Sequence, residues 1–159
     1  MTIRRAIVYV VFFAAAASLW LFTHSERAQI KRVFADVERL ASKEPSEPVF
    51  ESIARSQALS RHFKDGCLIV HLGYGLRTMY SREDIAGGML LFRSASGKIA
   101  VAFRELDVSV EGGKARVQGC CDYSGSDSTW QGFKPRSEIF SANLEKLGGK
   151  WLVSKIKFP

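Results

Sequence analysis

The chain has 159 residues, which is enough for one ordinary domain with a hydrophobic core. Apolar residues make up 47% of the sequence and charged residues 25%, and this balance excludes an intrinsically disordered chain. The formal net charge of +7 predicts a basic surface that attracts anions.

The chain begins with a hydrophobic leader. Arg4 and Arg5 precede an uncharged, mostly apolar run over residues 6–23. Positive charge before such a run predicts that the N-terminus stays in the cytoplasm and that the rest lies outside. The run is at the short end of the roughly 17–25 residues that a spanning helix needs. It fits an uncleaved membrane anchor or a signal peptide cleaved within residues 14–18, and the length favours the anchor.

We therefore divide the chain into a leader, residues 1–23, and one domain, residues 24–159. An uncleaved leader is expected to contact the inner membrane through residues 6–23. The domain is expected to face the periplasm, or to be periplasmic or secreted if the leader is cleaved. Because an exported domain rarely meets nucleic acid, we interpret the basic surface as solvated or attracted to anionic lipid headgroups, and we expect no nucleic-acid binding.

Two helices follow the leader. Over residues 24–43, six apolar residues recur at helical spacing, which predicts a helix that covers a core: Ile30, Val33, Phe34, Val37, Leu40 and Ala41. Two prolines end this helix. The next helix is expected to begin near Pro48, with Phe50, Ile53 and Ala54 on its apolar side and a kink or a second short helix near Ser56.

A short strand and a third helix come next. Asp65-Gly66 predicts a stop, residues 67–72 a strand, and residues 73–80 a loop. Ser81 is a good N-cap for the third helix, and Asp84 three residues later completes a pattern that resembles a capping box. The pair Gly87-Gly88 inside this helix predicts a close approach to a sheet.

Residues 98–158 predict four β-strands. The pairs Gly112-Gly113 and Gly148-Gly149 each lie between apolar, alternating runs and predict two-residue hairpin turns. Residues 122–132, rich in Ser, Asp and Gly, predict a loop between the two hairpins. In the first of these strands the apolar alternation changes phase at Arg104-Glu105. A β-bulge there would place Phe103 and Leu106 on one face of a sharply bent strand.

The last strand is expected to direct Leu152, Ile156 and Phe158 inward, with Ser154 between them. On this register Ile139, Trp151 and Val153 lie on the opposite face of the sheet. An exposed apolar face of this kind predicts a second covered surface or the contact of a homodimer.

The expected order is helix, helix, strand, helix and four antiparallel strands, one of them bent. This order, the helix start Ser81-Arg82-Glu83-Asp84-Ile85 and the closing run LEKLGGKWLV at residues 144–153 resemble the nuclear transport factor 2-like superfamily, also called SnoaL-like or cystatin-like. The resemblance covers roughly residues 26–158. It implies an α+β cone in which a curved, mostly antiparallel sheet of four to six strands wraps around three helices, here behind the N-terminal hydrophobic helix. Members include ketosteroid isomerases, dehydratases, polyketide cyclases and non-catalytic assembly domains.

The resemblance also suggests where a site would lie. Isomerase-like members carry a catalytic Asp near the end of the first strand, and this chain has His71 there. Histidine is a suitable general base near neutral pH, and a nearby tyrosine such as Tyr123 is a hydrogen-bond donor. The expected pocket residues are His71, Tyr74, Phe103, Cys121, Tyr123 and Ser154. The alternative is a structural role for His71, either at the rim of the cone or in the core with its hydrogen bonds satisfied. Tyr74 and Tyr123 would then be packing residues.

No motif for a metal or a cofactor appears in the sequence. His24, His62 and His71 lack the paired spacing of metal ligands, and neither a Cys-x-x-Cys pair nor a Gly-rich phosphate loop after a strand is present. Three cysteines, Cys67, Cys120 and Cys121, leave two alternatives open outside the cytoplasm. The first alternative is one disulfide, and a bond between Cys67 and Cys121 would require their Cα atoms to lie within about 7 Å. The second alternative is three reduced thiols.

Two functions follow from these patterns. The first is a membrane-tethered or exported binding and assembly module without catalytic activity. The second is a small-molecule enzyme or a binder of a small lipophilic ligand, isomerase-, dehydratase- or cyclase-like, which uses the interior of the cone with His71 as base. A fold of this kind hosts both. An enclosed cavity on which His71 and a further polar group converge would favour the second function. A filled interior with an apolar patch outside around Trp151 and Val153 would favour the first.

Overall fold

The computed structural model describes residues 25–126 and 135–159. The leader predicted over residues 1–23 lies outside these ranges, so its two alternatives stay predictions. Among the helices that the structure describes, none is both long enough and apolar enough to cross a membrane.

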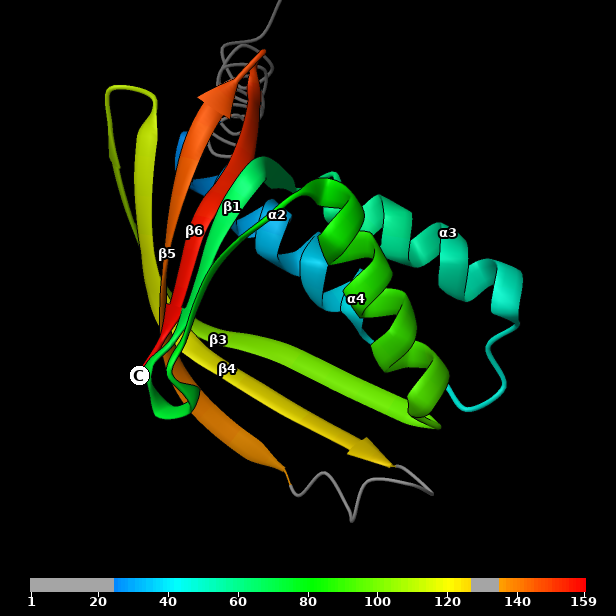
Figure 1. The fold of residues 1–159 in the computed structure, drawn as a ribbon. Helices are drawn as coiled ribbons and strands as arrows, with labels where there is room; N and C mark the ends of the chain where they lie inside the picture. Colours follow the sequence, from blue (N-terminus) through cyan, green and yellow to red (C-terminus); the bar gives the residue numbers. More distant parts are fainter. Residues whose placement is uncertain (1–24, 127–134) are drawn as a thin grey trace, which may run out of the picture.

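The described residues form three helices and one mixed six-stranded sheet (Figure 1). The helices are α2 (Glu26–Ala41), α3 (Val49–Ser60) and α4 (Arg82–Ala95). The strands are β1 (Phe63–His71), β2 (Leu76–Tyr80), β3 (Lys98–Glu111), β4 (Lys114–Ser126), β5 (Arg136–Leu147) and β6 (Lys150–Phe158), with a 3-10 turn η1 (Leu72–Tyr74) after β1. The strand order is β2-β1-β6-β5-β4-β3, in which β1 and β6 run parallel and the other neighbours antiparallel. The curved sheet and the helices on its inner side confirm the predicted α+β cone.

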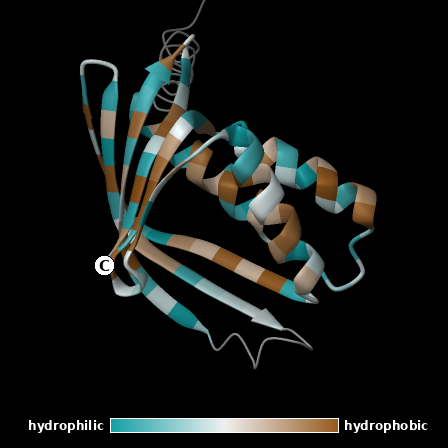
Figure 2. Ribbon diagram, viewed as in Figure 1, coloured by the Kyte–Doolittle hydropathy of each residue, from teal (hydrophilic) through white to brown (hydrophobic). Residues whose placement is uncertain are grey.

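Helix α2 supplies the centre of the core. Its N-cap Ser25 accepts a hydrogen bond from the amide of Ala28, and the predicted apolar stripe faces the sheet. Phe34 from this stripe meets Phe103 of β3 and Phe140 of β5, with ring centroids 5.2 Å and 5.6 Å away. Figure 2 shows apolar segments along both α2 and β3. The middle of the cone is therefore filled by side chains.

The bend in β3 is where the phase change predicted it. Pairing between β3 and β4 slips between Arg104 and Asp107, and Glu105 takes the positive φ of 54°. Phe103 and Leu106, on the two sides of the slip, both pack against the core. The bulge is confirmed, and so are both hairpin turns, because all four turn glycines have positive φ.

Strand β6 contains a second bulge, which the sequence did not reveal. Asn143 pairs with Lys155 but Leu144 pairs with Val153, so Ser154 has no residue opposite it. This slip turns Trp151 and Val153 into the core, where they are 4% and 2% exposed. Their predicted place on the outer face is therefore wrong. Ile139 is exposed as expected. The homodimer stays a prediction, but the three residues do not form the shared outer surface on which it was based.

Helix α3 buries polar residues where apolar ones were expected. It is one continuous helix without the expected kink, and Phe50 near its start is 75% exposed, whereas Ser52 and Ser56 are buried. The hydroxyl of Ser52 donates to Glu47, and that of Ser56 donates to the carbonyl of Ser52. Since these small hydroxyls are satisfied locally, α3 packs its serine face inward.

Three further boundaries differ from the prediction. Gly66, with a φ of 72°, lies inside β1 as an irregularity and does not end an element, and the expected loop over residues 73–80 contains β2. Strand β4 continues to Ser126, so residues 122–126 are not loop; residues 127–134 lie outside the described ranges. In α4 the capping box of Ser81 and Asp84 is confirmed, but Gly87 and Gly88 are exposed and do not approach the sheet.

Candidate functional site

The end of β1 brings together side chains from four parts of the chain. His71 is the last residue of β1 and pairs in register with Phe158 near the end of β6. Turn η1 follows, and the amide of Gly73 donates to the carbonyl of Pro159, which holds the turn against the chain's end (Figure 1). Gly75 closes the turn with a φ of 64°, a conformation that favours glycine.

A carboxylate holds the His71 imidazole from one side. Nε2 of His71 lies 3.2 Å from Oε2 of Glu138 in β5, and both side chains are 19% exposed. The ring of Phe158 stacks on the imidazole with centroids 5.6 Å apart, and the ring of Tyr74 lies 4.3 Å away. Nδ1 is buried and has no hydrogen-bond partner in the described part of the chain. A carboxylate only accepts, so Nε2 carries the shared proton, and in the neutral imidazole Nδ1 keeps its lone pair.

Tyr123 extends the contact into a network. Its hydroxyl donates to Oε1 of Glu138 over 2.7 Å. Burial, together with this bond and the charge on Glu138, raises the pKa of Tyr123 to about 12, although Arg136 opposes the shift. The phenol is therefore a neutral donor at physiological pH.

Arg136, the first residue of β5, completes the cluster. Its Nη1 donates to the hydroxyl of Tyr74 over 2.8 Å, and the guanidinium also hydrogen-bonds Tyr123. The bond to Tyr74, then that to Tyr123, raises the pKa of Arg136 above its ordinary value. Five side chains thus form one closed group, which we call the His71 cluster: His71, Tyr74, Tyr123, Arg136 and Glu138.

Three of the six predicted pocket residues, His71, Tyr74 and Tyr123, belong to this cluster. Glu138 and Arg136 were missed. Glu138 stands in the same alternating phase of β5 as Phe140 and Ala142, so its inward direction was visible in the sequence. Arg136 lies two residues before it and was counted with the solvated basic surface.

Two other predicted residues line the filled core. Phe103 packs between Phe34 and Phe140, with ring centroids 5.2 Å and 5.3 Å away. Cys121 is buried in the same cluster of apolar residues, and burial, with smaller contributions from nearby carboxylates, raises the pKa of its thiol to about 11. Both side chains are packed against other core residues in this structure, so neither lines an open site.

All three cysteines are free. Cys67 in β1 and Cys121 in β4 are separated by β6 and β5 in the sheet. Neighbouring strands lie about 4.8 Å apart, so the two residues are about 14 Å apart across the sheet, well beyond the reach of a disulfide. Of the two alternatives for the cysteines, this arrangement fits the reduced thiols.

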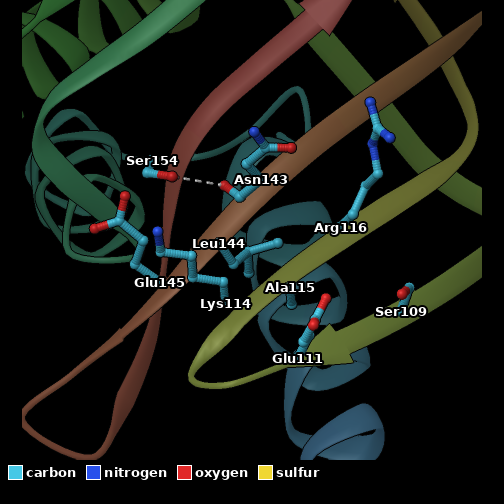
Figure 3. Close-up of a pocket in the computed structure, with 9 residues that line it drawn as sticks. All are labelled: Ser109, Glu111, Lys114, Ala115, Arg116, Asn143, Leu144, Glu145 and Ser154. Atoms are coloured by element: carbon cyan, nitrogen blue, oxygen red, sulfur yellow. Dashed lines mark hydrogen bonds between the residues drawn. The ribbon is translucent and has the colours of Figure 1, made fainter.

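Ser154 lies in a different place because of the bulge in β6. It lines a groove of about 500 Å³ on the outer face of the sheet, together with Lys114, Arg116 and Asn143 (Figure 3). Its hydroxyl donates to the carbonyl of Asn143 over 3.2 Å. His71 does not line this groove, so the prediction that Ser154 shares a pocket with His71 is wrong.

The His71 cluster has the parts of an acid–base site. It contains a histidine with one nitrogen committed to a carboxylate, a neutral phenol donor, and a cation. Within the described residues, no group of three or more His, Cys, Asp or Glu side chains is placed to hold a metal ion. The chemistry that these side chains support by themselves is proton transfer.

Comparisons with known proteins identify the fold. No family model and no curated protein sequence matches the chain. Among solved structures, it is similar to a candidate scytalone dehydratase from Novosphingobium aromaticivorans, with 10% identity over 84% of this chain and 82% of that one and a TM-score of 0.68. An NTF2-like protein with a cystatin-like fold from the same organism shares 19% identity over 91% and 86% of the two chains, with a TM-score of 0.64. A candidate calcium/calmodulin-dependent protein kinase II association domain from Xanthomonas campestris shares 12% identity over 86% and 88%, with a TM-score of 0.63. At these identities the likeness shows the cystatin-like, NTF2-like fold alone.

Proposed function

We propose that the protein is a small-molecule enzyme that moves a proton on its substrate with His71 as general base. The observation that carries this proposal is the contact of Nε2 with Glu138, 3.2 Å long, combined with a buried Nδ1 that has no partner among the described residues. A carboxylate that fixes one imidazole nitrogen directs the other nitrogen, with its lone pair, at a reacting group. A buried nitrogen without a partner is costly in a purely structural histidine.

Each remaining member of the cluster has a role in this proposal. Glu138 is a positioning residue, which holds the tautomer and stabilises the imidazolium after proton transfer. Tyr123, kept neutral by its raised pKa, donates to Glu138 and completes the network behind the base. Phe158 and Tyr74 enclose the ring and exclude water. The dehydratase among the structural neighbours is compatible with such chemistry.

The middle of the cone is filled, and Trp151 and Val153 are buried in it. His71 lies at the rim, so access to Nδ1 requires Tyr74 to move. Tyr74 is 68% exposed and lies in the short turn η1 between Gly73 and Gly75. A Cβ built at Gly73 would lie 3.5 Å from Nδ1 of His71, so the glycine leaves this edge of the ring uncrowded. A substrate that displaces the ring of Tyr74 would meet Nδ1 directly.

The test is proton exchange on a neutral ketone. The full chain in detergent micelles is incubated with cyclohexanone in deuterated water, and loss of the α-proton signal is followed by NMR. We expect the wild-type protein to accelerate exchange. His71→Asn should remove at least about a hundredfold of the acceleration, the usual contribution of a general base. Glu138→Gln should give a smaller loss, because the base remains but its orientation weakens.

The matched control is His62→Asn. His62 is also partly buried, but it precedes β1 and does not belong to the His71 cluster. Exchange at the wild-type rate in His62→Asn, with loss in His71→Asn, would support the proposal. No acceleration by the wild-type protein, or equal rates in the His71 and His62 variants, would refute it.

A second candidate is the assembly module, tethered at the outer surface of the inner membrane by the leader. It is favoured by large apolar side chains left exposed on the helices, Val49 and Phe50 of α3 and Leu91 of α4, each about three quarters exposed. The association domain among the neighbours shows that the fold is compatible with assembly. Sedimentation velocity of the full chain against Phe50→Ser tests this candidate, and fractionation with N-terminal mass spectrometry tests the tether. A monomer in both proteins would exclude self-assembly through this surface.

A further inference from the structure

Arg136 is a cation without a carboxylate partner at the mouth of the proposed site. Its side chain is exposed, and its partners are the hydroxyls of Tyr74 and Tyr123. No carboxylate in the described residues forms an ion pair with it, since Glu138 is already committed to His71 and Tyr123. A guanidinium has five N–H donors in a planar fork, so several remain for a ligand.

The charges around Arg136 define which ligand fits. Glu138 is engaged by His71 and Tyr123, and no carboxylate among the described residues pairs with Arg136, so a single negative charge on a ligand would be the first to do so. A doubly charged phosphate would also bring a second charge close to Glu138 and be repelled more strongly. The planar guanidinium matches the two oxygens of a carboxylate, which it binds through two parallel hydrogen bonds.

We propose that the substrate is a small monocarboxylic acid, and that its carboxylate replaces the hydroxyl of Tyr74 on Arg136. This inference rests on the proposed function and names its substrate class. A carboxylate offers the guanidinium a full negative charge and two parallel acceptors, whereas the hydroxyl of Tyr74 offers one neutral acceptor, so the exchange of partners is favourable. It also releases Tyr74, whose ring covers His71. The same charged group therefore orients the substrate and favours the displaced position of Tyr74, which a neutral ketone reaches less often.

The test compares an acid with its neutral amide. Binding of hydrocinnamate and of hydrocinnamide to the full chain is measured by isothermal titration calorimetry in the same detergent. We expect the acid to bind at least about tenfold more tightly than the amide. Arg136→Gln should lower the affinity for the acid to that for the amide, and Arg136→Lys should restore part of the difference, because lysine keeps the charge but not the fork.

Two further variants make the outcome specific. Arg116→Gln removes an exposed cation from the groove on the outer face and should keep the preference for the acid. His62→Asn should also keep it, because His62 lies outside the His71 cluster. Equal affinities for acid and amide, no binding of the acid, or a loss of preference in Arg116→Gln as large as in Arg136→Gln would overturn the inference.

The two proposals fail in different ways. Proton exchange on cyclohexanone that depends on His71, together with equal affinities for acid and amide, would refute the substrate class and leave the base in place. A preference for the acid that depends on Arg136, without any exchange that depends on His71, would refute the enzyme and leave a carboxylate-binding protein.

Discussion

Arg93 of α4 and Glu47, in the segment between α2 and α3, form an ion pair that is almost completely buried, with side chains 0% and 3% exposed. Nη2 of Arg93 lies 2.6 Å from Oε1 of Glu47. Nη1 donates to the carbonyls of Leu40 and Ala41 at the end of α2, over 2.7 Å and 3.1 Å. These carbonyls have no partner within the helix, so one cation satisfies the end of α2 and joins it to α4.

Replacing Arg93 should be among the most damaging substitutions in the helical layer. Arg93→Met keeps the length of the side chain but leaves Glu47 buried without its cation, for an expected loss of about 3–5 kcal/mol in the free energy of unfolding. The matched control is Arg39→Met, whose pair with Asp36 is exposed and should contribute about 0–1 kcal/mol. Urea denaturation of both variants measures the difference. Similar losses would mean that the buried pair has no special role.

The same pair predicts how stability depends on pH. Burial by itself raises the pKa of Glu47, but hydrogen bonds from Arg93 and Ser52 and the charges on Arg93 and Arg55 outweigh it, so the pKa lies below 4.5. The folded protein thus binds fewer protons at this group than the unfolded chain. Its contribution is complete above pH 4.5 and is lost as the pH falls through the lower folded pKa. The stability gap between wild type and Glu47→Gln should therefore shrink on acidification; a constant gap would contradict this.

Two glycines provide opposite expectations for the same substitution. A Cβ at Gly119, opposite the bulge in β3, would lie 2.8 Å from the carbonyl oxygen of Arg104 and from Leu106. Gly119→Ala should therefore cost about 1–3 kcal/mol. Gly88 in α4 has nothing within 4 Å of its Cβ position, so Gly88→Ala should gain roughly 0.5–1 kcal/mol. Chemical denaturation of the two variants should give shifts of opposite sign.

Titration of Tyr123 reports on the His71 cluster without a substrate. Its pKa of about 12 is due first to burial and then to Glu138. Glu138→Gln removes a negative charge beside the phenol, so tyrosinate should form at a lower pH and the pKa should move toward 10. The ultraviolet absorbance of tyrosinate measures the change, and Tyr123→Phe assigns the transition. In Glu145→Gln, a control whose carboxylate binds Lys64, the transition should not move.

The three thiols should differ in reactivity. Burial raises the pKa of both Cys67 and Cys121 to about 11, with smaller effects of nearby carboxylates on Cys121, so little of the reactive thiolate forms at mildly alkaline pH. Cys120 is half-buried and points away from the core. An aromatic disulfide reagent should label one thiol rapidly, and Cys120→Ser should abolish that phase. Rapid labelling of two or three thiols in the folded protein would contradict the arrangement.

The bends of the sheet show how far the sequence determines the fold. At Arg104 the apolar residues change phase openly, from Val101 and Phe103 to Leu106 and Val108, and the bulge followed from that pattern. At Ser154 the same change was hidden. Leu152 stands in phase with Ile156 and Phe158, so a regular strand accounted for all three as inward-facing residues. In the structure Trp151 and Val153, not Leu152, belong to the core cluster.

The site was predictable in part for a similar reason. His71 could be found because a strand ended there, and Tyr74 and Tyr123 because aromatic residues were expected in a pocket. Glu138 and Arg136 were missed because charged residues at the start of a strand usually face solvent. Nothing local shows that β5 lies close enough to the end of β1 for them to meet His71. That proximity depends on β6, which pairs with both strands.

The placement of β6 has a consequence for biogenesis. This strand fills the slot between β1 and β5, yet it is made after both. A nascent chain that has completed β5 therefore has open edges on β1 and β5 until β6 inserts between them. Open strand edges can pair with other chains and lead to aggregation. The last segment to emerge both completes the sheet and brings His71 and Glu138 within reach of each other, so a misassembled chain would lack the His71 cluster and keep open strand edges.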